Sequence, residues 1–357
     1  MSRDYITDSF YGTNHFPPED LGELLAKSSD RDIAVILEEA GRVRNQRFGK
    51  RINLYAPLYL SNYCSNHCLY CGFNSSRDIP RTVLTPEETQ KEVEYLASAG
   101  FKSVLLVGGE DPFRAGHSYY RDAISPLLKT FSSVSLELSP FSISEYQKLY
   151  AAGADGVTVY QETYNENLYA DYHISGSKKD YRWRLETPER AALAGIPNVN
   201  IGALLGLAPW KEEILALASH LNYLIKKYWK VNFGISFPRI LSKSEDFKVP
   251  YPVSDRDFVK ILASMRLCFP DTPIYLSTRE SPVMRDNLLK YGVTHMSAES
   301  QTAPGGYLNP GSVCEQFGVT DTRKVVDIME TIKSAGLSPV FKDWDKGYIP
   351  SEKNLCG

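Results

Sequence analysis

The chain has 357 residues, of which 43% are hydrophobic, and a formal net charge of −3. This length and composition suit one large barrel or two ordinary domains and predict a globular protein with a full core. The basic residues are scattered, which argues against a nucleic-acid-binding surface, and no apolar run approaches the roughly 20 residues that span a bilayer. The polar, acidic start of the chain is unlike a secretory leader, so we expect a reducing cytoplasm.

In chain order, a helical segment is expected to about residue 50, and short β-rich runs then alternate with amphipathic stretches. Eight strands are predicted, at Ile52–Tyr59, Ser103–Val107, Val134–Leu138, Gly156–Tyr160, Val199–Leu204, Asn232–Phe237, Pro273–Ser277 and Val293–Ser297. Helices are predicted at Thr85–Ala99, Ser142–Ala152, Trp210–Tyr228, Asp255–Cys268 and Thr322–Ala335, the first with Thr85 as its N-cap.

This alternation predicts an α/β protein with a (βα)8 TIM-type barrel over residues 51–345, between an N-terminal helical segment (1–50) and a C-terminal tail (346–357). A doubly wound sheet would alternate in the same way, but it would not bring polar groups together from the end of every strand.

Three of the six cysteines, Cys64, Cys68 and Cys71, follow the first predicted strand. Three thiolates can hold three irons of a [4Fe-4S] cluster and leave the fourth iron open to an outside ligand. Zinc with His67 as fourth ligand is a rival interpretation, although closed zinc sites usually draw on two separated pairs of ligands. A disulfide is a weaker rival, because nothing indicates secretion. The other cysteines are expected to be buried or incidental thiols, at Cys268, Cys314 and Cys356.

The Cys-x3-Cys-x2-Cys spacing, with an aromatic residue at Tyr70, resembles the signature of the radical-SAM enzymes, which bind and reductively cleave S-adenosylmethionine. The resemblance implies a ligand-facing backbone at Gly108-Gly109-Glu110, which by itself could be an ordinary turn. Glu137 and Glu162 end strands three and four, where carboxylates suit the ammonium, sulfonium and ribose hydroxyls of that cofactor. Salt bridges to Arg182 or Arg184 are the alternative for either glutamate. Arg182 could also receive the methionyl carboxylate of the cofactor.

Two arginines, Arg239 and Arg279, follow strands six and seven. A lone arginine is usually a solvated surface charge, but two at the ends of barrel strands favour capture of an amino acid carboxylate. Ser277 and Ser281 could add hydrogen bonds. We therefore predict a substrate site at these four residues, across the barrel from the cysteines.

Several stretches together resemble the tyrosine lyases of thiamine biosynthesis, the 2-iminoacetate synthases. They are Pro57–Asn62, Val159–Tyr164, Trp183–Pro188, Ser236–Arg239, Leu276–Pro282, Pro304–Tyr307 and Pro339–Asp345. The resemblance implies cleavage of the Cα–Cβ bond of L-tyrosine, which gives dehydroglycine and p-cresol. It also implies thiazole synthase as a protein partner and a reduced flavodoxin or ferredoxin as electron donor.

Three other functions remain open. The hydrogenase maturase that also cleaves tyrosine is similar, but it adds a C-terminal domain with a second cluster, and here only Cys356 lies near the end. A related lyase could act on another amino acid such as tryptophan, and a non-catalytic scaffold could dock on thiazole synthase. Asn165 and Phe233-Gly234 depart from the usual family pattern and could alter the substrate pocket.

Overall fold

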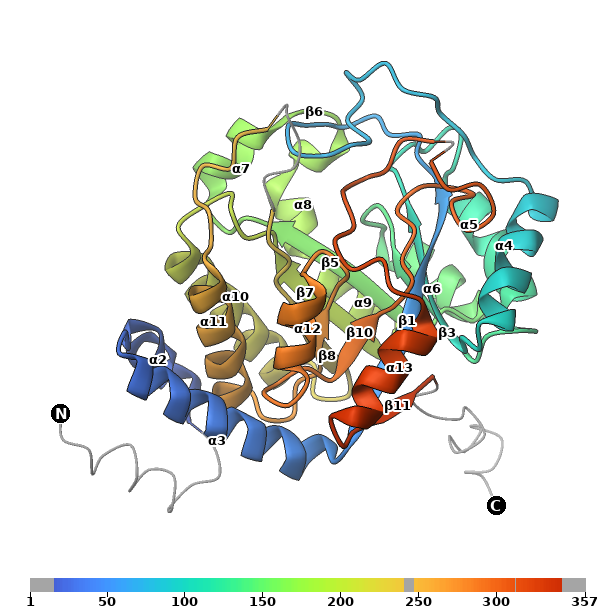
Figure 1. The fold of residues 1–357 in the computed structure, drawn as a ribbon. Helices are drawn as coiled ribbons and strands as arrows, with labels where there is room; N and C mark the ends of the chain where they lie inside the picture. Colours follow the sequence, from blue (N-terminus) through green and yellow to red (C-terminus); the bar gives the residue numbers. More distant parts are fainter. Residues whose placement is uncertain (1–15, 241–246, 312, 342–357) are drawn as a thin grey trace, which may run out of the picture.

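The computed structural model describes residues 16–240, 247–311 and 313–341. Within these ranges, parallel strands alternate with helices and close into a barrel (Figure 1). The barrel strands are β1 (Arg51–Ser61), β3 (Ser103–Gly108), β4 (Ser133–Glu137), β5 (Gly156–Glu162), β7 (Asn198–Ala203), β8 (Asn232–Ser236), β9 (Ile274–Leu276) and β10 (His295–Ser297). The ring closes where His295 of β10 pairs with Asn53 of β1. The predicted eight-stranded barrel is therefore confirmed.

Three short strands were not predicted. β11 (Ser338–Val340) pairs in parallel with the start of β1. β2 (His67–Cys68) and β6 (His173–Ser175) form a separate antiparallel pair above the barrel. Segments of two or three residues are too short to show a period of two, so their sequence carries no strand signal.

Helices follow most of the strands. They are α4 (Pro86–Ser98), α5 (His117–Leu127), α6 (Ile143–Ala152), α7 (Glu166–Tyr172), α8 (Tyr181–Leu185), α9 (Thr187–Leu193), α10 (Trp210–Lys227), α11 (Asp255–Cys268), α12 (Pro282–Leu288) and α13 (Val325–Ser334), with a 3₁₀ turn η2 (Ser177–Lys179). Thr85 caps α4 as predicted, in a reciprocal pair of hydrogen bonds with Glu88. Among the described helices, none is both long and apolar enough to cross a bilayer.

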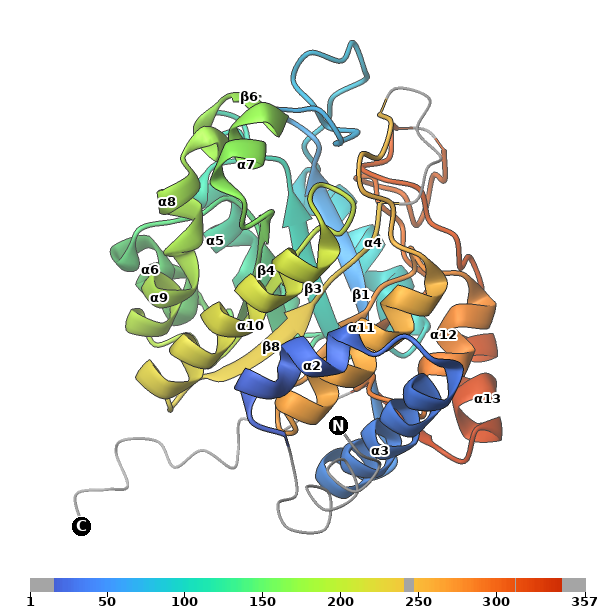
Figure 2. The ribbon, with the colours of Figure 1, turned by 90° about the vertical axis from the view of Figure 1, so that its left-hand side faces the viewer.

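The N-terminal segment contains η1 (Pro18–Asp20), α2 (Leu21–Ala26) and α3 (Asp30–Phe48), which lie outside the barrel. Figure 2 shows α2 and α3 beside α11, and α2 also contacts α10. Buried Arg44 of α3 donates from Nε to the carbonyl oxygen of Val293, 3.2 Å away, and so joins α3 to the chain just before β10. We keep the domain boundary near residue 50 as a proposal; the expected tail at 346–357 lies outside the described residues.

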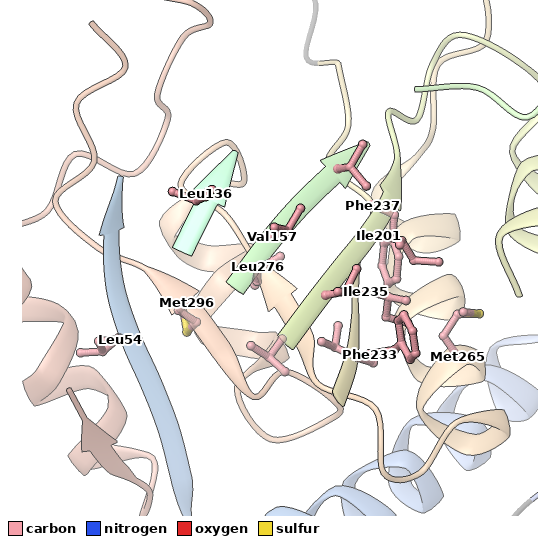
Figure 3. Packing of buried hydrophobic residues seen from close by; sticks show 14 of the residues in the cluster. Leu54, Leu136, Val157, Ile201, Phe233, Ile235, Phe237, Met265, Leu276 and Met296 are labelled. Atoms are coloured by element: carbon pink, nitrogen blue, oxygen red, sulfur yellow. The ribbon is translucent and has the colours of Figure 1, made fainter. Parts of the chain in front are cut away.

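The core lies between the strands and their covering helices. Along β4, Val134 and Leu136 are buried against this layer, whereas the alternating residues Ser133, Ser135 and Glu137 line a cavity inside the barrel. Figure 3 shows part of the core, with side chains from several strands beside Met265 of α11. TIM barrels usually fill their interior with branched apolar side chains. This barrel instead presents polar side chains to its interior, which leaves room for ligands.

Candidate active site

The cysteine loop lies at the end of the barrel where the parallel strands terminate, at the top of Figure 1. Cys68 is buried and Cys64 and Cys71 are half-buried, and all three are free thiols. Burial, together with the neighbouring Cys64, raises the pKa of the Cys71 thiol to about 11. Burial likewise raises the pKa of Cys68, whereas the cation of Lys178 lowers it. Binding of iron would therefore release protons from these thiols.

The loop is fastened to the end of β3 by backbone contacts. The amide of Gly109 donates to the carbonyl oxygen of Ser61 at 3.0 Å, and the amide of Ser65 donates to that of Glu110 at 3.0 Å. A Cβ at Gly109 would overlap the Tyr63 carbonyl group, and it would lie 3.1 Å from Cβ of Cys64. Glycine is thus required at position 109 because the cysteine loop approaches the backbone there.

Gly108 has a different neighbour. A Cβ at this position would overlap the hydroxyl group of Tyr120, with the ring carbon Cζ only 2.8 Å away. Tyr120 belongs to α5 and is buried. The lack of a side chain at Gly108 therefore makes room for a helix on the outside of the barrel. A contact between the Gly108 backbone and the cofactor stays a prediction.

A network of four charged side chains lies beside the cysteine loop; Glu110, Glu162 and Arg184 are buried and Lys178 is half-buried. Arg184 Nη1 lies 3.0 Å from Glu110 Oε1, and Arg184 Nη2 lies 3.6 Å from Glu162 Oε1. Lys178 Nζ donates to Glu162 Oε1 at 2.6 Å. Glu110 also accepts a hydrogen bond from Asn66 of the cysteine loop at 2.7 Å. The network therefore connects the end of β3, the end of β5 and the cysteine loop.

The two carboxylates of this network are held ionised. Burial alone would raise the pKa of Glu110, but Arg184, Lys178 and the Asn66 hydrogen bond lower it below its ordinary value. Burial would also raise the pKa of Glu162, and Lys178 and Arg184 outweigh this effect. Glu162 has φ of 71°, a left-handed conformation that costs about 1–3 kcal/mol for such a residue. Its carboxylate is thereby fixed at the rim of the cavity.

The prediction for Arg182 needs correction. Arg182 is exposed, whereas Arg184, two residues further along α8, is buried and forms both ion pairs. Residues two apart point to different sides of a helix, so only one of these arginines can face the barrel. Sequence reasoning offered Arg184 only as an alternative salt-bridge partner and missed Lys178, which lies in a segment of turns with no recognisable pattern.

A cavity of about 450 Å³ opens between the cysteine loop and the far strands of the barrel. This volume is in the range of small-molecule sites. Several predicted residues line it, namely Tyr70, Cys71, Glu137, Glu162, Ser277 and Arg279. The hydroxyl group of Tyr70 lies 2.8 Å from Nε2 of buried His173, which fixes the ring at the wall. Glu137 and Arg279 have no hydrogen bond to their side chains and no ion pair among the described residues.

The four residues predicted to hold the substrate divide into two pairs. Arg279 lies in the cavity with its guanidinium 3.4 Å from the ring centroid of Phe317, and Ser277 is beside it. Arg239 borders the cavity, but its guanidinium is bonded to Glu280 and Asp255 and lies over the ring of Phe258 of α11.

Ser281 is the N-cap of α12 and accepts from the amide of Met284. Ser281 and Arg239 are thus correctly placed in the chain, but their polar groups already serve the fold. A contact between either residue and the substrate stays a prediction.

The segment 313–320 also lines the cavity, and it was not predicted as part of the site. Gln316 accepts a hydrogen bond from the hydroxyl group of Tyr59 at 2.6 Å, and the ring of Phe317 stacks against the guanidinium of Arg279. Cys314 borders the cavity as well, whereas Cys268 is buried as expected; Cys356 lies outside the described residues. This segment lacks regular secondary structure, so no periodic pattern could place it.

The donor set of the cysteine loop suits an iron–sulfur cluster. Within the described part of the chain, no three His, Cys, Asp or Glu side chains converge as they would round a single ion. A cubane cluster differs from a zinc site because separate thiolates hold separate irons. His67, the expected fourth zinc ligand, lies with Nε2 3.4 Å from the hydroxyl group of Ser76.

Comparisons with known proteins agree with this site. Residues 58–220 match the model of the radical-SAM superfamily, and residues 231–338 match the biotin and thiamin synthesis associated domain. The fold, the cysteine loop and this match define a radical-SAM enzyme, a class that uses a [4Fe-4S] cluster and S-adenosylmethionine.

The chain is 38% identical to the 2-iminoacetate synthase of Salmonella typhimurium over 332 residues, which cover 93% of this chain and 88% of that protein. It is also 38% identical to the Escherichia coli 2-iminoacetate synthase, over 92% of this chain and 87% of that protein. The chain therefore belongs to the 2-iminoacetate synthase family. The FeFe-hydrogenase maturase HydG of Carboxydothermus hydrogenoformans is similar in structure, with a TM-score of 0.86 and 34% identity over 92% of this chain and 77% of that one.

Proposed function

We propose that this enzyme cleaves the Cα–Cβ bond of L-tyrosine to form dehydroglycine, which is 2-iminoacetate, together with p-cresol. The reaction is supported by the 38% identity to two 2-iminoacetate synthases over most of both chains. One observation carries the amino acid part of the proposal. Arg279 presents a cation to the cavity that Cys71 also lines, and no carboxylate of the described residues pairs with it.

The cofactors belong on the cysteine side of the cavity. When bound, the cluster and S-adenosylmethionine supply one-electron reduction and the power to remove a hydrogen atom from the substrate. We assign Cys64, Cys68 and Cys71 to the irons, and Glu162 at the rim to the cofactor's polar groups. Tyr70 closes the wall between them.

Other residues position these groups. Arg184 and Lys178 keep Glu162 ionised and in place, and Glu110 holds Asn66 of the cysteine loop. Because positioning to within about 1 Å controls the rate of such steps, the network contributes to catalysis without touching the substrate.

On the opposite wall, Arg279 receives the substrate carboxylate, and its planar guanidinium suits a two-point contact. Ser277 adds a hydroxyl group beside it. Tyr59 and Gln316, joined by their 2.6 Å hydrogen bond, form a wall that excludes water from the reacting end of the substrate.

Partners and compartment follow from this chemistry. A low-potential flavodoxin or ferredoxin would reduce the cluster, and thiazole synthase would consume dehydroglycine before water hydrolyses it. Reduced thiols are needed to bind iron, so a reducing cytoplasm suits the enzyme.

The test is anaerobic reconstitution followed by product identification with tyrosine. Formation of p-cresol and 5′-deoxyadenosine in step with tyrosine loss is expected, with none from a Cys71→Ala control. Cleavage of tryptophan in place of tyrosine would make the enzyme a related lyase. Binding of S-adenosylmethionine without cleavage of any amino acid would refute a catalytic function.

A further inference from the structure

Half-buried Glu137 differs from the two buried carboxylates nearby, Glu110 and Glu162. It is the last residue of β4, and alternation along that strand turns its side chain toward the inside of the barrel. Glu110 and Glu162 are bonded to Arg184 or Lys178. The carboxyl group of Glu137 has no hydrogen bond or ion pair within the ranges that the structure describes, so its partner must come from elsewhere.

The surroundings of Glu137 favour neither a permanently charged nor a permanently neutral carboxyl group. The pKa of Glu137 is raised to about 7, chiefly by burial; Arg279 opposes this rise and the charge of Glu162 adds to it. Lys178 and Arg184 also lower it. The facing hydroxyl groups belong to Tyr55 and Tyr59 of β1 and Tyr160 of β5. Burial raises the pKa of each above its ordinary value, so these groups stay neutral. The adjacent β3 presents only apolar side chains to the cavity, Leu105 and Val107.

Glu137 and Arg279 together match a free amino acid. One carries a carboxyl group and the other a guanidinium, both line the same cavity, and the cation of Arg279 lowers the pKa of Glu137. Neither forms an ion pair with the described residues, and both side chains are half-buried, so their polar groups are accessible to a ligand in the cavity. A zwitterion has an ammonium and a carboxylate on one carbon and would satisfy both groups at once. Arg279 would take its carboxylate, so Glu137 is left to face its ammonium.

We propose that Glu137 binds the α-ammonium group of the substrate and accepts one proton from it before the radical step. This inference rests on the proposed function, in which a hydrogen atom leaves the amino nitrogen. One N–H bond breaks, its electron pair stays on nitrogen, and the proton forms an O–H bond with the carboxylate of Glu137. No oxidant or reductant is needed. The product is a neutral amine, from which loss of a hydrogen atom leaves a neutral aminyl radical instead of a radical cation.

This role replaces the cofactor contact that the sequence suggested for Glu137. The two roles make different demands. Loss of a cofactor contact would weaken binding of S-adenosylmethionine. Loss of the substrate contact would leave that binding intact and would weaken only those ligands of the substrate site that carry an amino group. A residue that accepts a proton works best when its pKa is close to the operating pH.

Binding measurements separate the two roles. Equilibrium dialysis would compare tyrosine with 3-(4-hydroxyphenyl)propanoate, which lacks the amino group, on the reconstituted enzyme with S-adenosylmethionine bound. For Glu137→Gln, affinity for tyrosine should fall roughly tenfold while affinity for the deamino compound stays the same or rises, since one buried charge pair is lost. Arg279→Gln should weaken both ligands. Equal effects of Glu137→Gln on both ligands, or weaker S-adenosylmethionine binding in their place, would overturn the proposal.

The pH profile tests the proton transfer. Turnover of the wild type should rise to a plateau above about pH 7, and Glu137→Gln should lose roughly a hundredfold or more. The residual rate of that variant should keep rising at higher pH, where hydroxide can deprotonate the ammonium, and Glu137→Asp should restore part of the activity. An unchanged rate and profile in Glu137→Gln would refute the role.

Two controls keep the outcomes distinct. Iron content and the cluster spectrum of Glu137→Gln should match the wild type, which excludes misfolding. Failure of the wild type to form p-cresol would refute the proposed function itself. The dialysis comparison would still decide whether Glu137 recognises an amino group.

Discussion

Gly109→Ala should disable the enzyme by displacing the cysteine loop. The added Cβ would lie 2.8 Å from the carbonyl carbon of Tyr63, about 0.7 Å or more inside the optimal separation of two carbon atoms. Backbone atoms on both sides cannot swing away, so the loop that carries Cys64 must move by a comparable distance. A displacement near 1 Å can cost about a hundredfold in rate, and overpacking costs about 1–3 kcal/mol.

Iron analysis, the EPR spectrum of the reduced cluster and p-cresol formation would measure this effect after anaerobic reconstitution. Gly22→Ala is the matched control, because a Cβ at Gly22 has no neighbour within 4 Å and Gly22 lies in α2. The control should keep full activity and gain up to about 1 kcal/mol of stability. Wild-type iron content and activity in Gly109→Ala would refute the steric reasoning.

The remaining predictions concern charge and cysteine chemistry. Arg184→Gln removes the cation that two buried carboxylates share, although Lys178 still pairs with Glu162 and Asn66 still donates to Glu110. It should cost about 3 kcal/mol of unfolding free energy, whereas exposed Arg182→Gln should change it by less than about 0.5 kcal/mol; equal urea midpoints would contradict this. Because the pKa of Glu137 is raised to about 7 in the folded state, the wild type loses stability as pH rises from 4.5 through about 7. Glu137→Gln should therefore be more stable than the wild type by about 3 kcal/mol at pH 8 and by much less at pH 5. An equal gain in unfolding free energy at pH 5 and pH 8, measured on the reduced apo-protein, would show that the pKa of Glu137 is not raised in the folded state. Cys71→Ala should abolish cluster binding and turnover, while Cys268→Ala should keep both; iron retained in the first or lost in the second would misassign the ligands.

The barrel could be predicted because each of its longer strands has a clear apolar run and each strand end has turn signals. The cysteines were placed correctly because their spacing alone brings them into one loop. The same reasoning located Arg279, since a residue just past a barrel strand must lie at the mouth. These inferences use local sequence together with a known architecture.

What failed depended on side-chain direction and on irregular segments. Arg182 and Arg184 are equally plausible in sequence, and only the packing of α8 shows which one is buried. Arg239 follows its strand as expected, but its guanidinium forms an ion pair with Glu280, which lies in the loop after the next strand. Lys178 and Phe317 lie in segments without periodicity, so contacts distant in sequence decide their positions.

The small sheet of β2 and β6 gives a further connection between the cysteine loop and the segment that carries Lys178. Cys68 pairs with His173, and the chain leaving β6 leads within a few residues to Lys178, whose amide donates to Asn66. Iron held by the cysteine loop therefore also steadies the backbone beneath the cation that holds Glu162. An enzyme molecule that has lost its cluster to oxygen should release S-adenosylmethionine as well.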